Sequence, residues 1–164
     1  MDWDEMVDRH AAIVWRAAGR LLGHGHEAAD CFQDTFLAAF ELSRRQEVEN
    51  WAGMLAKIAT ANALNRLRKR YRQPVRPLES AAAVAMSVPP PGSAIEAQEL
   101  ADRLIAGLVE LPEAQAQVFC LHCFEDQPHE QIAAALGIEP GNVRVLLHRA
   151  RAKLKEVLQY QPRA

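Results

Sequence analysis

Apolar residues recur at helical spacing along most of this chain, and no stretch alternates between apolar and polar residues as a half-buried strand does. Positions three and four residues apart share one face of a helix, so each apolar series predicts an amphipathic helix with a buried face. The predicted helices cover residues 3–22, 27–43, 51–72, 95–109 and 113–124, with two shorter ones inside residues 126–155. The pattern therefore predicts an all-α protein.

The helix predicted at residues 27–43 has two contrasting faces. Its apolar face carries Phe32, Phe36 and Phe40 at a spacing of four residues, which predicts an aromatic core stripe. The polar face carries Asp30, Gln33 and Asp34. Taken by itself, such a face is most simply explained as surface exposed to water.

The helix predicted at residues 51–72 becomes strongly basic toward its end, after a start that Asn50 is predicted to cap. Residues 57–76 hold seven basic side chains and no acidic one, so no i, i+4 ion pair relieves their repulsion and an external anion is expected to do so. The polar positions of this end are Asn62, Asn65, Arg66, Arg68, Lys69 and Arg70. Asparagine and arginine side chains can hydrogen-bond to base edges, and Tyr71 offers a stacking surface.

Residues 74–94 predict a linker rich in proline and alanine. Prolines break helices, and the alanine-rich stretch between them lacks amphipathic order. The chain is thereby divided into a first domain at residues 1–73, the linker, and a second domain at residues 95–164. Because the domains are tethered, binding by one raises the effective concentration of the other. The first helix after the linker is predicted to bury Ala97, Leu100, Ala101, Leu104, Ile105 and Leu108.

Residues 126–155 have the form of a helix-turn-helix. A short apolar series ends at Gly137, and a second series follows the turn sequence at residues 139–142. From Gly141 to Lys155 the second helix has no acidic residue and carries five lysines and arginines. Such a helix fits the major groove of DNA, where side chains read bases and hold phosphates. The alternative is a helical hairpin with a solvated basic face.

Charge is distributed unevenly along the chain, although the net charge is only −2. Residues 1–49 hold ten acidic and five basic side chains, and residues 89–139 hold nine acidic and one basic. The two basic stretches therefore lie in acidic surroundings. Two basic stripes predict a polyanion held at two places, while the acidic faces limit indiscriminate binding.

The three cysteines, the acidic start and the absence of a long apolar run predict a cytoplasmic protein without membrane insertion. Cys120 and Cys123 have the C-x2-C spacing of structural zinc sites, but they lie inside a predicted helix among apolar residues and have no second pair. They are interpreted as core residues, and no metal or other cofactor is expected. The chain shows no nucleophile–base order, phosphate-binding loop or carboxylate pair that would predict an enzyme.

Taken in order, these motifs resemble the extracytoplasmic-function (ECF) type of bacterial RNA polymerase sigma factor, over residues 4–159. The residues that carry the resemblance are Asp30–Phe36, Ala63–Arg70, Leu111–Pro112, Ile132–Ala133, Leu136–Gly137, Gly141–Val143, His148–Arg151 and Leu154. Each motif is moderately specific, whereas their order and spacing in a chain of this length are highly specific.

The resemblance implies a transcription initiation factor that binds core RNA polymerase and directs it to promoters. The first domain would dock on the polymerase clamp through Asp30, Gln33 and Asp34. It would also recognise and melt the minus-ten element, using the loop at residues 43–50 and the basic end of the helix at residues 51–72.

The resemblance assigns the minus-thirty-five element to the second domain. The residues that match the family's DNA-reading positions are Arg144, Val145, His148 and Arg149, and Arg151 matches a phosphate contact. An anti-sigma factor is a further partner that the resemblance suggests, since many members of the family are controlled in that way.

The chain departs from the family pattern at six positions. They are Met54 for tryptophan, Ala61 for asparagine, Asn65 for aspartate, Pro128 for serine, Asn142 for threonine and Leu146 for arginine. Leu146 removes one phosphate or acidic-partner contact and is expected to extend an apolar surface instead.

Two other classes of protein fit parts of the pattern. A stand-alone helix-turn-helix regulator, with a first domain that senses a ligand or dimerises, explains residues 126–155 equally well. It leaves the second basic stripe and the polar face around Gln33 unexplained. The second class is an interaction protein such as an anti-sigma decoy. Its acidic helices would bind a partner, and contact with DNA would be secondary.

Overall fold

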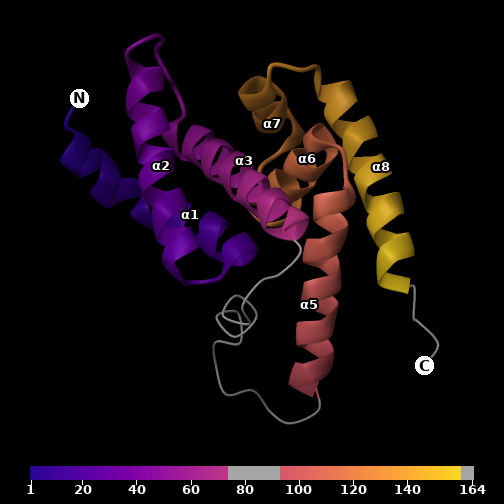
Figure 1. The fold of residues 1–164 in the computed structure, drawn as a ribbon. Coiled ribbons are helices and arrows are strands. Elements are labelled where there is room, and N and C mark those ends of the chain that lie inside the picture. Colours follow the sequence, from indigo (N-terminus) through magenta and orange to yellow (C-terminus); the bar gives the residue numbers. More distant parts are fainter. Residues whose placement is uncertain (74–92, 160–164) are drawn as a thin grey trace.

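The computed structural model describes residues 1–73 and 93–159, which form seven α-helices and no strand, as the all-α prediction requires. The helices are α1 (Trp3–Leu22), α2 (His26–Ser43), α3 (Trp51–Arg72), α5 (Ser93–Glu110), α6 (Glu113–Cys123), α7 (His129–Leu136) and α8 (Pro140–Gln159). Helix α3 runs through the centre, with α1 and α2 on one side and α5 to α8 on the other (Figure 1). No described helix is long and apolar enough to cross a membrane.

Helices α1, α2 and α3 pack into a three-helix unit. Side chains cap two of them: Asp2 accepts from the backbone amide of Asp4, and Asn50 accepts from the amide of Gly53 at 3.0 Å. The predicted cap at Asn50 is thus confirmed. The buried core residues of this unit are Met6, Val14, Ala17, Phe36, Ala39, Leu55 and Ala59.

The aromatic stripe of α2 is only partly buried. Phe36 is 8% exposed, whereas Phe40 is 40% exposed and meets the ring of Trp3 edge-on, with ring centroids 5.3 Å apart. The prediction that Phe40 belongs to the core is therefore wrong. Phe40 is covered by Trp3, which is the first residue of α1. Because α1 does not extend beyond Trp3, much of the Phe40 ring stays exposed to solvent.

In the second half, α7 and α8 form the predicted helix-turn-helix, and α5 and α6 complete its core. Helix α7 starts after Pro128 and ends at Gly137, whose φ of 68° lies in the left-handed region that favours glycine. Gly107 lies at the contact between α5 and α8, where an added Cβ would lie 2.8 Å from Leu154 Cδ2 and would force that side chain to shift. The buried residues around the helix-turn-helix include Val118, Leu121, Ile132, Ala133, Val143 and Leu147.

Helix α5 differs from its prediction at both ends, because it begins at Ser93 and ends at Glu110. The last two residues of the predicted linker are therefore helical, while residues 74–92 lie outside the described part. Leu108 is buried as predicted, but Leu100 is 51% exposed. The inward positions predicted for Ala97, Leu100 and Ala101 are wrong, because the first turns of α5 project beyond α3 (Figure 1).

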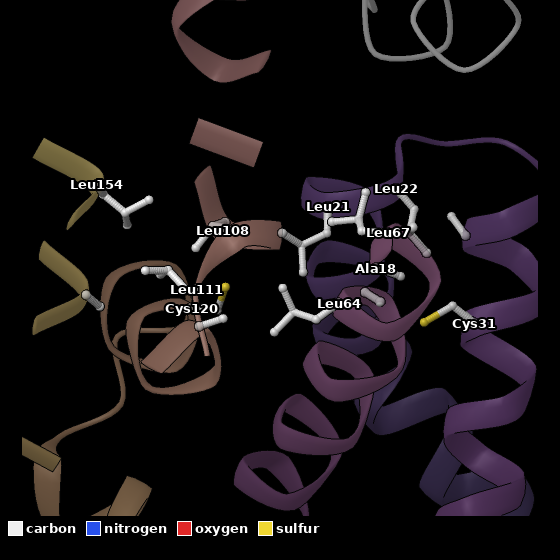
Figure 2. Close-up of a cluster of buried hydrophobic side chains, with 14 residues drawn as sticks. Ala18, Leu21, Leu22, Cys31, Leu64, Leu67, Leu108, Leu111, Cys120 and Leu154 are labelled. Atoms are coloured by element: carbon white, nitrogen blue, oxygen red, sulfur yellow. The ribbon is translucent and has the colours of Figure 1, made fainter. Parts of the chain in front are cut away.

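The two halves share a hydrophobic core. Its buried members include Ala18, Leu21, Leu22, Leu64 and Leu67 from the first half, and Leu108, Leu111, Cys120 and Leu154 from the second (Figure 2). The helical periodicity predicts which residues are buried but not that these two sets meet. The division at residues 1–73, 74–94 and 95–164 stays a prediction, since the described helices pack together.

Polar contacts also cross between the halves. Arg20 of α1 donates to the Phe124 carbonyl and lies 3.4 Å from the Glu125 carboxylate, and Gln127 Nε2 donates to the Gly53 carbonyl at 3.4 Å. Within the described residues, the buried Oε1 of Gln127 has no hydrogen-bond partner. A buried polar atom without a partner costs free energy. The contact between the halves is therefore weaker than its apolar area alone would make it.

Candidate nucleic-acid interfaces

The exposed face of α8 is set by its helical repeat. Val143, Leu147, Ala150 and Leu154 are buried, so most of the positions between them point outward. All five predicted contact residues are exposed: Arg144, Val145, His148, Arg149 and Arg151. Four of these side chains are long or ring-shaped polar groups that can reach base edges or phosphates, and the apolar Val145 can contact a thymine methyl group. The arrangement fits a helix that enters a major groove.

Leu146 faces the other way. It is partly buried and packs against the cluster that contains Val118 and Leu121. The family's arginine at this position is therefore replaced by a side chain that contributes to the core of the helix-turn-helix. The apolar surface that Leu146 extends therefore faces the protein core and not the solvent.

The basic end of α3 carries the second set of predicted contacts. Asn65 and Lys69 are exposed, whereas Arg68 is partly buried, and its Nη2 has no hydrogen-bond partner within the described residues. Arg66 and Arg70 are paired with carboxylates of α2: Arg66 Nη2 lies 2.5 Å from Asp34 Oδ2, and Arg70 pairs with Glu27.

These ion pairs correct one argument made from the sequence. The lack of acidic residues near residues 57–76 predicts that an external anion relieves the repulsion along α3. For Arg66 and Arg70 this is wrong, because α2 supplies the anions from positions far away in the chain. Spacing along one helix cannot reveal a partner on another helix.

The predicted docking face of α2 lies open to solvent. Asp30, Gln33 and Asp34 are all exposed, and Leu37 beside them is 65% exposed. Leu37 was not among the predicted site residues, although it follows Gln33 and Asp34 at helical spacing. Together these side chains form an exposed face of mixed polar and apolar character.

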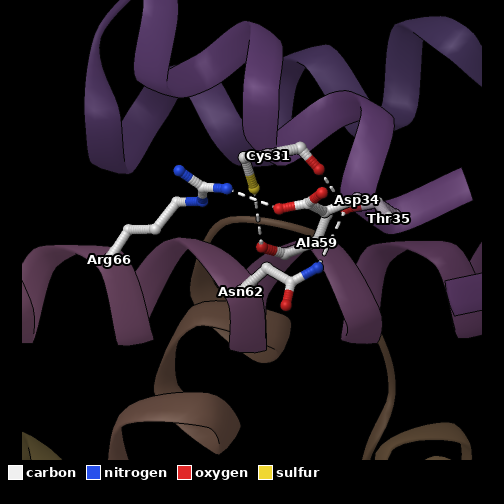
Figure 3. Close-up of polar contacts among 6 residues, drawn as sticks. All are labelled: Cys31, Asp34, Thr35, Ala59, Asn62 and Arg66. Carbon is white, nitrogen blue, oxygen red and sulfur yellow. Dashed lines mark hydrogen bonds and ion pairs between the residues drawn. The ribbon is translucent and has the colours of Figure 1, made fainter. Parts of the chain in front are cut away.

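Hydrogen bonds fix how α2 and α3 lie against each other beneath these surfaces (Figure 3). Cys31 Sγ donates to the Ala59 carbonyl at 3.7 Å, and Thr35 Oγ1 donates to the Cys31 carbonyl at 2.7 Å. Asn62 Nδ2, one of the predicted DNA contacts, donates to Thr35 Oγ1 at 3.5 Å. Burial raises the pKa of the Cys31 thiol, so the group stays neutral and acts as a hydrogen-bond donor.

The cysteine and histidine residues of α6 do not converge on one point. Cys120 is buried in the shared core as predicted, and burial raises the pKa of its thiol. Cys123 is exposed, so its interpretation as a core residue is wrong. His122 Nδ1 lies 3.1 Å from the Gln127 carbonyl, and its ring is 4.9 Å from that of His129. Among residues 1–73 and 93–159, no group of three or more histidine, cysteine or acidic side chains could hold a metal ion.

The fold and these surfaces define an all-helical protein with a helix-turn-helix in its second half, whose last helix exposes a basic face. Residues 6–73 match the family model described as Sigma-70 region 2, and residues 101–154 match the model described as Sigma-70, region 4. The ECF RNA polymerase sigma factor SigE of Mycolicibacterium smegmatis is 34% identical over 157 residues. The chain belongs to the family of ECF RNA polymerase sigma factors.

The relatives differ in how much of their length this chain represents. The alignment to SigE covers 95% of this chain but 61% of the relative. The ECF sigma factor SigW of Bacillus subtilis is 25% identical over 169 residues, which cover 94% of this chain and 88% of the relative.

Two solved structures share the fold. One is the sigma factor RpoE in complex with the anti-sigma factor NepR from Bartonella quintana, with a TM-score of 0.60 and 21% identity over 98% of this chain and 99% of that chain. The other is CnrH in complex with the cytosolic domain of CnrY, with a TM-score of 0.60 and 20% identity over 95% and 86% of the two chains.

Proposed function

We propose that this protein is a transcription initiation factor that binds core RNA polymerase and directs it to specific promoters. The observation that carries the proposal is the presence of both sigma-70 regions, in order, on one chain whose second region exposes a basic recognition helix. The factor supplies binding and no catalytic group of its own, and its place of work is the cytoplasm, with the polymerase and the chromosome.

The first half is proposed to dock on the polymerase and to open the DNA. The exposed face with Asp30, Gln33 and Asp34 would bind the polymerase clamp, and Leu37 would add an apolar contact. The loop at residues 43–50 and the basic end of α3 would hold the unpaired minus-ten strand. The α3 residues with this proposed role are Asn62, Asn65, Arg66, Arg68, Lys69 and Arg70. A basic surface that follows a backbone, with side chains able to stack on bases, is what single-strand binding requires.

The second half is proposed to read the minus-thirty-five element as a duplex. Arginine can form two hydrogen bonds to guanine, so Arg144 and Arg149 are the side chains with the greatest power to discriminate between bases. His148 and Val145 would add a polar and an apolar contact, and Arg151 would hold a phosphate. All five side chains are exposed, so they can reach a DNA duplex without a rearrangement of the helix-turn-helix.

The two halves must separate on a promoter. The centres of the two elements lie about 25 base pairs apart, which is about 85 Å along the duplex. Helix α3, which runs through the centre of the packed molecule, has 22 residues and is about 33 Å long, much shorter than this distance. The connection from Gln73 to Ser93 can reach about 70 Å at most, so it allows the halves to move apart. The packed arrangement is therefore proposed to be the resting form, in which the shared core is closed.

An anti-sigma factor is the proposed regulatory partner. Support comes from the two structures with the same fold, one of which is described as a complex with an anti-sigma factor. A partner that binds the packed form more tightly than the separated form would hold the factor inactive.

Binding to purified core RNA polymerase tests the docking role. The wild-type chain is expected to co-elute with core polymerase in gel filtration. The double variant Asp30→Ala with Gln33→Ala is expected to lose this complex while its helix content and unfolding midpoint stay unchanged, because both side chains are exposed.

The rival function is a stand-alone regulator that binds its DNA site without polymerase. In that case the wild type and the double variant would both fail to bind the polymerase and would both bind duplex DNA equally well. Unchanged co-elution of the double variant would remove the docking role from this face of α2.

A further inference from the structure

An ion pair connects the proposed docking face with the proposed DNA-binding surface. Arg66 Nη2 of α3 lies 2.5 Å from Asp34 Oδ2 of α2, so the charge of each side chain is already paired with that of the other (Figure 3). Asp34 belongs to the face that would meet polymerase, and Arg66 belongs to the surface that would hold the unpaired strand. Neither side chain can serve a new partner fully while the pair is intact.

The helices beneath this pair are held in place independently of it. Two hydrogen bonds join α2 to α3, one from Cys31 Sγ to the Ala59 carbonyl and one from Asn62 Nδ2 to Thr35 Oγ1, and Cys31 and Thr35 are fully buried. Breaking the ion pair therefore requires a rotation of two side chains and no movement of either helix.

A neighbouring ion pair has a different character. The side chains of Arg70 and Glu27 are only 12% and 30% exposed, and Arg70 also donates to the Leu22 carbonyl. In contrast, Arg66 is 26% exposed and Asp34 is 53% exposed. The Arg66 pair is therefore more open to exchange than the Arg70 pair, since exposed ion pairs are weak.

We propose that the Asp34–Arg66 pair couples polymerase binding to binding of the unpaired DNA strand. In the free protein the Asp34 carboxylate takes the place of a DNA phosphate on Arg66. When a cationic group of the polymerase binds Asp34, the guanidinium of Arg66 is released and becomes available to a phosphate. By linkage, DNA bound to Arg66 frees Asp34 and strengthens polymerase binding by the same factor. This inference rests on the proposed function.

Binding of the full-length chain to single-stranded DNA, without polymerase, tests the coupling. A phosphate contact does not depend on sequence, so the probe is a fluorescent single-stranded oligonucleotide of mixed sequence. Asp34→Asn is expected to bind it about two- to five-fold more tightly than the wild type, as the loss of a weak exposed pair allows. The plot of log affinity against log salt is expected to steepen by about 0.7, the value for one additional phosphate contact.

Two variants serve as controls. Glu41→Gln removes a carboxylate from the same helix that has no ion pair with a described residue, so its effect is expected to be smaller and without a change in salt slope. In the background of Arg66→Gln, adding Asp34→Asn is expected to give no more than the small gain of Glu41→Gln and no change in salt slope, because no guanidinium is released.

The coupling would be overturned if Asp34→Asn bound like the wild type, matched Glu41→Gln, or kept its gain in the Arg66→Gln background. These outcomes leave the proposed function standing as long as the wild type binds core polymerase. A wild type that bound neither core polymerase nor DNA would overturn both.

Discussion

The buried positions of α8 dictate that Arg144, His148 and Arg149 point outward, and this outcome follows from helical spacing alone. The role of Arg66 could not be derived in the same way. Its partner Asp34 lies on another helix, and a single sequence contains no signal for such a pair. Local periodicity therefore predicts which residues of α8 are exposed, but it does not predict which exposed charges are already paired.

Replacing Arg149 with alanine is expected to weaken binding to a minus-thirty-five duplex by about 1–3 kcal/mol, through the loss of a contact to a base edge. Arg151→Ala serves as the matched control. It is expected to weaken binding equally on all sequences and to lower the salt slope by about one. Titrations against the cognate duplex and single-base variants distinguish the two. An equal loss for Arg149→Ala on every duplex would exclude base reading by that residue.

Burial raises the pKa of Glu125 and outweighs the lowering by Arg20 and Arg16. An acid with a raised pKa in the folded state binds its proton more tightly there, so its contribution to stability is full below the unfolded pKa of about 4.3 and is lost as pH rises through the folded pKa. Glu125→Gln is therefore expected to raise the midpoint of thermal unfolding at neutral pH. The difference is expected to vanish below about pH 4, where the wild-type side chain is also neutral.

The exposed Glu99 on α5 lies outside the first turn of its helix and provides a control for that measurement, since Glu99→Gln is expected to leave the midpoint unchanged. A lower midpoint for Glu125→Gln at neutral pH would show that the ion pair with Arg20 outweighs the cost of burial.

Among the helices, the helix-turn-helix was the easiest to predict, because glycine and proline mark its boundaries in the sequence. The start of α5 was harder. Leu100 is exposed in its first turns, although it is apolar and lies at helical spacing. That spacing does not show whether another helix extends far enough to cover the residue. Phe40 failed as a core prediction for the same reason: which residues cover a helix end depends on the lengths of other helices.

Gly137 allows the turn between α7 and α8 to adopt φ of 68°. Gly137→Ala is expected to lower the free energy of unfolding by about 1 kcal/mol, because a side chain disfavours the left-handed region. Gly141→Ala is the matched control in α8, where an added Cβ meets no atom, and it is expected to be neutral or slightly stabilising. Chemical denaturation of both variants measures the difference, and equal effects would remove backbone conformation as the reason for Gly137.

At the scale of the whole molecule, the two halves are joined by a shared core that the sequence did not predict. Amphipathic periodicity marks a face as buried without saying whether its cover comes from its own domain or from the other. Ala56 shows this clearly: it lies on α3, yet the buried side chains around it belong to α6, α7 and α8. The all-α class was predictable, and the contact between the halves was not.

Ala56→Glu is expected to separate the halves while leaving each folded. A carboxylate at this position would be buried against Val118 and Leu121 in the packed form and exposed to water in the separated one. Energy transfer between fluorophores on α2 and α8 is expected to fall relative to the wild type, with helix content unchanged. The exposed Ala38→Glu on α2 is the control and is expected to change neither signal. Loss of helix content in Ala56→Glu would instead show that the halves fold as one cooperative unit.

Transcription from genomic DNA tests whether the chain directs core RNA polymerase to promoters. Core RNA polymerase is incubated with fragmented genomic DNA, with and without the wild-type chain, and the starts of the transcripts are mapped. The wild-type chain is expected to produce starts at defined positions, each preceded by the same pair of sequence elements about 25 base pairs apart. The double variant Asp30→Ala with Gln33→Ala is expected to abolish these starts. The same starts with and without the wild-type chain would exclude a role in promoter selection.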